Sequence, residues 1–266
     1  MNKWEVELYI SSHSKIDKSI EFKSEKGDDD PFYSQINISN FYDGLKINIE
    51  AIAESEEDAI DAGYYFIGQA LNYISYKENL PFDLHKHLYQ GQSQKRNARK
   101  ILTKDDWVEA FKLGREIQRK RAENEGDREP YAYLSMSLSW YRKSLNSKDP
   151  IDSFLSRWLV LERLCKETNL IDDSLKQEKR TDTDEGKNKG DIFYKIKQKL
   201  LTYEIEMNFD RLYKIKNRRN DIAHGKFAIN KIEIIKEIIE MNKDIKEVSH
   251  QLLTKEVESF ISENSW

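Results

Sequence analysis

The stretch that decides the fold of the C-terminal half is NFDRLYKIKNRRNDIAHG, residues 208–225. At about 100° per residue, its apolar side chains fall on one side of a helix. They are Phe209, Leu212, Ile215, Ile222 and Ala223. This side is expected to face a core, and Arg219 falls in the middle of it.

A second predicted helix, PIDSFLSRWLVLERLCKE at residues 150–167, carries the opposite charge in the same kind of place. Glu162 lies in the middle of its apolar side. Burying a guanidinium costs free energy unless it pairs with a carboxylate or an equivalent group. We therefore infer that Glu162 and Arg219 meet. The alternative is that each long side chain extends to the edge of its own apolar stripe.

His224 lies on a polar side of its helix, one turn after Asn220. About 140° separates it from Arg219 on a straight helix, so the two cannot easily converge within one regular helix. Either the helix ends and turns near His224, which Gly225 favours as a terminator, or a second copy of the chain completes a site. A further alternative is an ordinary capping arrangement, in which the helix dipole favours the histidine.

Helical periodicity extends over the chain from Asp105 onward. Asp149 and Pro150 are typical of a cap and a first helical position. Residues 172–190 contain almost no apolar side chain and are expected to form a mobile loop. The other predicted helices cover residues 105–123, 129–147, 191–201 and 230–263.

The front of the chain predicts strands followed by a helix. Alternation predicts strands at residues 3–10, 33–39 and 45–53, the last two joined by the turn-like NFYDG into a hairpin. Ser55 and the acids after it predict a helix start, and this helix should run to about Lys77. One more strand is possible within residues 82–90. The expected fold class is an α+β N-terminal domain followed by an all-α helical bundle.

Charge is unevenly spread over the 266 residues, although the net charge is only -4. Residues 1–85 contain 17 acids and 7 Lys/Arg, whereas residues 86–104 contain 6 Lys/Arg and no acid. We expect an α+β accessory or sensor domain at 1–90, a basic connector at 91–104 and a helical domain at 105–266. The whole chain is not a strongly basic nucleic-acid binder.

The basic connector has two interpretations. It could follow an RNA backbone through its cations, with Tyr89 available for stacking on a base. The alternative is a solvated linker without a ligand. The candidate RNA-binding residues are Lys95, Arg96, Arg99 and Lys100.

Other site classes have little support in the sequence. No apolar run approaches the ~20 residues that span a bilayer, so no membrane partner is expected and the chain is expected to be cytoplasmic. Cys165 is the single cysteine, lies on the apolar side of its helix and is expected to be inert. His85 and His87 alternate on a possible strand, but no cluster of ligands supports a metal site. No metal or cofactor is expected.

The segment RNDIAHG resembles the signature of the HEPN superfamily, the higher eukaryotes and prokaryotes nucleotide-binding domain. That signature is an arginine, a following polar residue and a histidine after four to six intervening positions. Arg219, Asn220 and His224 fit it. The segments LYKIKNRRNDIAHG and FLSRWLVLERL are similar to the Apea-like branch, in which a helix bearing a glutamate precedes the motif, and Glu162 matches that glutamate. The resemblance covers roughly residues 105–266 and implies a HEPN-like helical bundle.

The resemblance implies a metal-independent endoribonuclease, usually a homodimer with two facing motifs. RNA would be cleaved to 2′,3′-cyclic phosphate and 5′-OH ends, in a toxin or an antiphage-defence effector. Histidine titrates near neutral pH and can move protons, and arginine can hold a phosphate. Asn220 could orient His224 or the ribose, Glu162 would fix the guanidinium, and Arg218 is an alternative phosphate ligand.

The alternative function is non-catalytic. A HEPN-type scaffold could serve dimerisation, or bind a nucleotide or a partner protein. In either case the N-terminal domain could receive a regulator or another protein partner.

Overall fold

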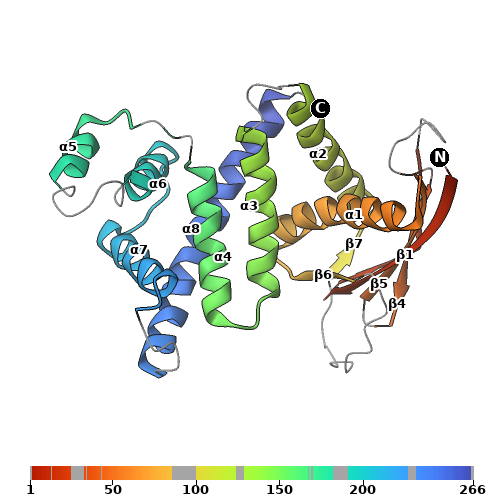
Figure 1. The fold of residues 1–266 in the computed structure, drawn as a ribbon, viewed down its shortest axis with the longest axis horizontal. Helices are drawn as coiled ribbons and strands as arrows, with labels where there is room; N and C mark the ends of the chain where they lie inside the picture. The colour runs from red at the N-terminus through yellow and green to blue at the C-terminus, as the bar shows by residue number, and fades with distance from the viewer. Residues whose placement is uncertain are drawn as a thin grey trace. The chain divides into compact units, whose positions relative to one another are not determined.

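The computed structural model describes residues 2–12, 14–24, 33, 35–42, 44–85, 100–123, 129–166, 168, 170–181, 191–226 and 232–264. The chain divides into two compact units, Met1–Arg119 and Lys120–Trp266. An antiparallel sheet dominates the first and helices the second (Figure 1), which confirms the expected order of an α+β part followed by a helical part.

The first unit is built on a sheet with strand order β3-β4-β5-β1-β6, and β2 pairs in parallel with β7. The alternation of apolar and polar residues in β1 and β5 places one row of each strand in the core. The elements are β1 Asn2–Ser12, β2 Ser14–Ile16, β3 Ile20–Lys23, β4 Gln35–Phe41, β5 Gly44–Ala53, α1 Glu56–Glu78, β6 Phe82–His85, β7 Lys100–Leu102 and α2 Lys104–Glu123.

Helix α1 covers one face of this sheet (Figure 1). A Cβ on Gly63 would lie 3.1 Å from Cδ1 of Ile49 and 3.6 Å from Cγ1 of Val6, so the helix approaches β5 and β1 closely. The predicted hairpin of β4 and β5 and the predicted start of α1 are both confirmed, with the Ser55 side chain accepting from the Asp58 N–H.

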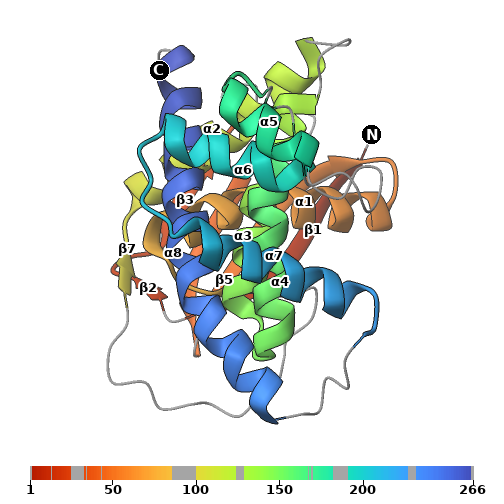
Figure 2. The same ribbon diagram turned by 90° about the vertical axis from the view of Figure 1, so that its left-hand side faces the viewer.

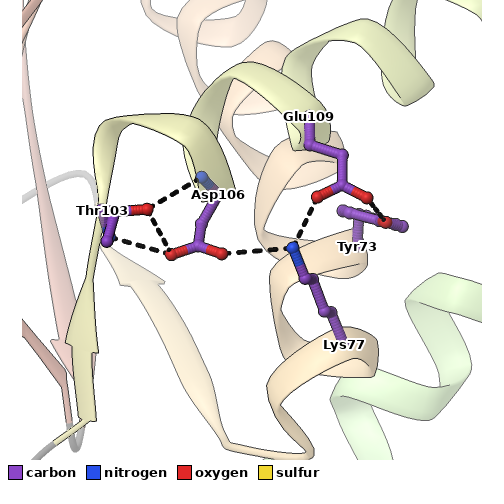
Figure 3. A network of polar contacts seen from close by, with 5 residues as sticks. All are labelled: Tyr73, Lys77, Thr103, Asp106 and Glu109. Carbon is purple, nitrogen blue, oxygen red and sulfur yellow. Dashed lines mark hydrogen bonds and ion pairs between the residues drawn. The ribbon is translucent and has the colours of Figure 1, made fainter. Parts of the chain in front are cut away.

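A network of polar contacts joins the last turns of α1 to the first turns of α2 (Figure 3). Lys77 donates to Asp106 at 3.2 Å and also to Glu109, and the Tyr73 hydroxyl donates to Glu109 at 2.5 Å. Asp106 also accepts from the backbone and the hydroxyl of Thr103. The network fixes the start of α2 to α1.

Helix α2 begins in the first unit, which differs from the expected grouping of residues 105–123 with the helical domain. Trp107 and Phe111 are buried, and the Phe111 ring stacks on Phe66 of α1 at 4.9 Å and meets Phe22 of β3 edge-on at 5.2 Å. Because of these long-range aromatic contacts, the boundary between the two units lies within α2 instead of in the basic connector. The charge pattern along the sequence carries no sign of such contacts.

The second unit is a group of helices around α4. They are α3 Glu129–Asn146, α4 Pro150–Leu164, α5 Asp173–Thr181, α6 Asp191–Thr202, α7 Phe209–Ala223 and α8 Ile232–Glu263. Helix α4 packs against α3 and α8. Helix α7 crosses α4 and α8 and is linked to both by side-chain contacts (Figure 2). Asp149 caps α4, as predicted, with its carboxylate 2.7 Å from the Ile151 nitrogen.

Helix α5 replaces part of the mobile loop that was expected at residues 172–190, so that prediction is wrong for residues 173–181. Asp172 accepts from the Ser174 N–H at 2.8 Å, Leu175 is buried, and Lys197 of α6 pairs with Glu178 at 2.9 Å. A buried apolar side chain, a cap and an ion pair to α6 help to hold this polar segment as a helix. No helix among the described residues is long and apolar enough to cross a bilayer.

Candidate functional site

Helix α7 presents the candidate motif. Its N-terminus is capped by Asn208, whose side chain accepts from the Arg211 N–H at 2.9 Å. Leu212 and Ile215 are buried, as the apolar side predicts. Towards the C-terminus this side opens to solvent, since Ile222 is half-buried and Ala223 is exposed. The motif therefore lies where the helix leaves the core.

The helix ends at Ala223, in the way that Gly225 predicts. Gly225 has φ +63°, the Gly225 N–H donates to the Ile222 carbonyl at 3.0 Å, and the Lys226 N–H donates to the Asp221 carbonyl at 2.9 Å. These two bonds form a Schellman motif with glycine in the left-handed position. His224 is thus the last residue before the turn, and its side chain is exposed.

The predicted contact of Glu162 with Arg219 is confirmed. Nη2 of Arg219 donates to Oε2 of Glu162 at 3.0 Å, which joins α7 to α4. The indole N–H of Trp158 donates to the same oxygen at 3.1 Å. The side chains of Arg219 and Glu162 are 28% and 32% exposed, so the pair lies at the surface of the bundle instead of in its core. Solvent limits such a pair to about 0–1 kcal/mol of stability.

Trp158 is a supporting residue that the sequence analysis does not assign to the site. Its ring is buried, and its N–H fixes the carboxylate that in turn fixes Arg219. The signal was present, because Trp158 and Glu162 are four positions apart and so lie on the same side of a helix.

Asn220 contacts Arg219, not the imidazole of His224. Its Oδ1 accepts from Nη1 of Arg219 at 3.0 Å, while its backbone carbonyl accepts from the His224 N–H at 2.9 Å. Asn220 and Glu162 therefore hold the guanidinium from two directions. The remaining N–H groups of Arg219 and the ring of His224 make no hydrogen bond with the residues that the structure describes.

Arg218 has a different environment. It pairs with Glu237 of α8, and its side chain is 16% exposed. Arg211 makes a second link to α8 through Asp244 at 2.8 Å. Arg218 therefore fastens α7 to α8, and the more exposed Arg219 is the better phosphate candidate of the two.

The proposed RNA-binding residues of the connector cannot be placed with the motif. Lys95, Arg96 and Arg99 lie outside the described residues, as do His87 and Tyr89. Lys100 begins β7, where it pairs with Ser14 of β2, and its side chain is not described. Whether the connector binds RNA stays a prediction.

Two further features include no residue of the motif. Burial raises the pKa of the Cys165 thiol to about 12, so this cysteine is held in the unreactive thiol form at neutral pH. A shallow surface depression of about 760 Å³ in the first unit is lined by residues 17–21, 23, 103 and 104 and contains no residue of the motif.

Comparison of the chain with protein-family models, with curated proteins and with solved structures finds no match.

Proposed function

We propose that this chain is a metal-independent endoribonuclease of the HEPN type. One observation carries the proposal. The guanidinium of Arg219 is held at the surface by Glu162 and Asn220, on a helix whose end exposes His224. An arginine oriented by a carboxylate and an amide, with N–H groups left for a ligand, suits a phosphodiester.

The chemistry needs only groups that the chain supplies. His224 accepts the proton of a ribose 2′-OH, and the 2′ oxygen then attacks the adjacent phosphorus. The bond from phosphorus to the 5′ oxygen breaks, and the departing oxygen takes a proton from solvent. Arg219 stabilises the negative charge that develops on the phosphoryl oxygens. The products carry a 2′,3′-cyclic phosphate and a 5′-OH.

The active species in this proposal is a homodimer. Arg219 and His224 leave a straight helix about 140° apart, so they do not converge within one chain. They can act on one phosphodiester when the arginine that serves each histidine comes from a second copy. Helix α4 offers a surface for that copy. Its half-buried side chains Ile151, Leu155 and Leu159 recur every four residues and lead to Glu162.

The rival proposal is a non-catalytic scaffold of the same fold. The scaffold is favoured by the two hydrogen-bond partners of Arg219, because Glu162 and Asn220 already occupy part of its guanidinium. Expression in a bacterial host separates the two proposals. A ribonuclease slows growth, and His224→Ala relieves the effect, whereas a scaffold does neither. A toxin or an antiphage effector, held off by a regulator, is the biological setting that we propose.

The direct test is incubation of the purified chain with a structured RNA in EDTA, beside His224→Ala and Arg219→Ala. The proposal expects cleavage by the wild type alone, with cyclic phosphate ends. Equal cleavage by all three proteins would indicate a contaminant and remove the support for these residues.

A further inference from the structure

The sheet of the first unit has a second face, opposite to α1, which we call the outer face. On β1 it consists of Lys3, Glu5, Glu7, Tyr9 and Ser11, and on β5 of Lys46, Asn48 and Glu50. The inner row of the same strands holds Val6, Leu8, Ile47 and Ile49, which lie in the core beneath α1.

Aromatic rings gather at one end of the outer face. The ring of Tyr9 lies 5.4 Å from that of Phe41, and the ring of Phe41 lies 4.5 Å from that of Tyr42. Lys46 lies over the Phe41 ring at 5.9 Å and also pairs with Glu7. The end of the face is therefore an aromatic surface whose lysine already has a carboxylate partner.

Tyr42 is held outward at a conformational cost. It is 83% exposed and has φ +42°, a left-handed conformation that bulky side chains rarely adopt. Asparagine or glycine would fit this position of the β4–β5 hairpin with less strain. A large ring kept in solvent at a strained position is typical of a binding residue.

The rest of the outer face is acidic. Glu5 lies directly opposite Glu50 on the neighbouring strand, an arrangement that like charges disfavour. The carboxylate of Glu5 makes no hydrogen bond or ion pair with the residues that the structure describes. Across the face, Glu5, Glu7, Glu21, Glu50 and Asp83 outnumber Lys3, Lys23 and Lys46.

We propose that the outer face binds a cationic peptide segment of a partner protein. One arginine or lysine stacks on the rings of Tyr42, Phe41 and Tyr9, and a second pairs with the carboxylate of Glu5. Tyr9 is four residues from Glu5 on β1, a distance of about 13 Å. An extended peptide with cations four positions apart matches this distance. The acidic excess disfavours the phosphates of RNA, which is the competing ligand for exposed aromatic rings.

The test uses the full chain and a fluorescent nine-residue peptide of threonine and valine with two arginines four positions apart. Its control peptide carries citrulline at both places, which keeps the shape and removes the charge. Binding is measured by anisotropy. We expect Glu5→Gln and Tyr42→Asn each to weaken binding about five-fold, from one charge pair or one cation–π contact. Tyr42→Asn suits the turn, so the hairpin is retained.

Matched variants on α1 serve as controls: Glu57→Gln and Tyr65→Ala remove an exposed acid and an exposed ring from the helix that covers the other face. They should bind the arginine peptide like the wild type. No binding by the wild type, or equal losses in the control variants, overturns the proposal. Binding of single-stranded oligouridine that Tyr42→Asn abolishes also overturns it. The assay involves no RNA cleavage, so its outcome is independent of the proposed ribonuclease.

Discussion

At the scale of single residues, the account rests on two side chains 57 positions apart. Glu162 and Arg219 meet across α4 and α7, with Trp158 behind the carboxylate and Asn220 beside the guanidinium. Because each charge is about a third exposed, the pair contributes to orientation more than to stability. Its main effect is that the arginine has one preferred position at the surface.

A double-mutant cycle measures this pair. Glu162→Gln, Arg219→Gln and the double variant should give a coupling free energy of about 0.5–1 kcal/mol in urea unfolding. The same single variants should lose RNA cleavage far more than this stability loss explains. A coupling of about 3 kcal/mol would contradict the account, since that size belongs to a buried pair.

The pair could be predicted because each charge interrupts an otherwise apolar helical stripe. The direction of Asn220 could not, since the wheel places it with His224 while its amide bonds to its chain neighbour Arg219. A wheel reports the angle at which a side chain leaves the helix, not the rotamer that a hydrogen bond selects. The exposure of Ala223 also depends on where α7 leaves its neighbours.

At the scale of elements, the end of α7 determines where His224 lies. Gly225 has φ +63°, and a Cβ there would meet nothing within 4 Å, so only backbone strain opposes a side chain. Gly225→Ala should destabilise the protein by about 1 kcal/mol and lower RNA cleavage. Gly225→Asn should lose less of both, because asparagine tolerates this conformation. Equal effects of the two substitutions in thermal unfolding would argue against strain as the cause.

The junction of α1 and α2 predicts a pH dependence. Partial burial alone would raise the pKa values of Asp106 and Glu109, but hydrogen bonds from Thr103, Lys77 and Tyr73 outweigh it and both pKa values are lowered. Burial alone would lower the pKa of Lys77, but its carboxylate partners outweigh it and the pKa is raised. The carboxylates stabilise the fold above their ordinary pKa values, and this contribution is lost as pH falls through the lowered ones. The lysine contribution is complete below its ordinary pKa of 10.5 and is lost as pH rises through the raised one.

Lys77→Met tests this junction. The difference in unfolding free energy between wild type and variant should be constant between about pH 5 and 10, and should shrink as pH falls below about 4.5. Lys112→Met, an exposed lysine on α2, should show no such trend. A difference for Lys77→Met that stays the same from pH 3 to 7 would contradict the assignment.

The elements also show where sequence patterns stop being informative. The caps of α1 and α4 could be predicted, because Ser55 and Asp149 act on their own first turns. Strand β7 has three residues and depends on β2, and α5 depends on a buried Leu175 and a contact with α6. Such partners lie far away in the sequence. A short or polar segment carries no local signal of them.

At the scale of the whole molecule, the half-buried row on α4 bears on assembly. Leu155→Asp should convert a homodimer into a monomer in light scattering and abolish RNA cleavage, because it places a charge in the proposed interface. The control is Leu201→Asp, which changes a leucine on α6 that is 49% exposed. This variant should remain a dimer. A wild-type chain that is monomeric at the concentration of the cleavage assay would contradict the composite site.

The measurement that tests the central claim most directly is RNA cleavage in EDTA by an equal mixture of Arg219→Ala and His224→Ala, each inactive alone. In a mixed dimer, one of the two composite sites keeps its arginine from one chain and its histidine from the other. Random exchange should therefore restore roughly a quarter of the wild-type rate. A mixture as inactive as its components, beside an active wild type, would contradict a site shared between two copies.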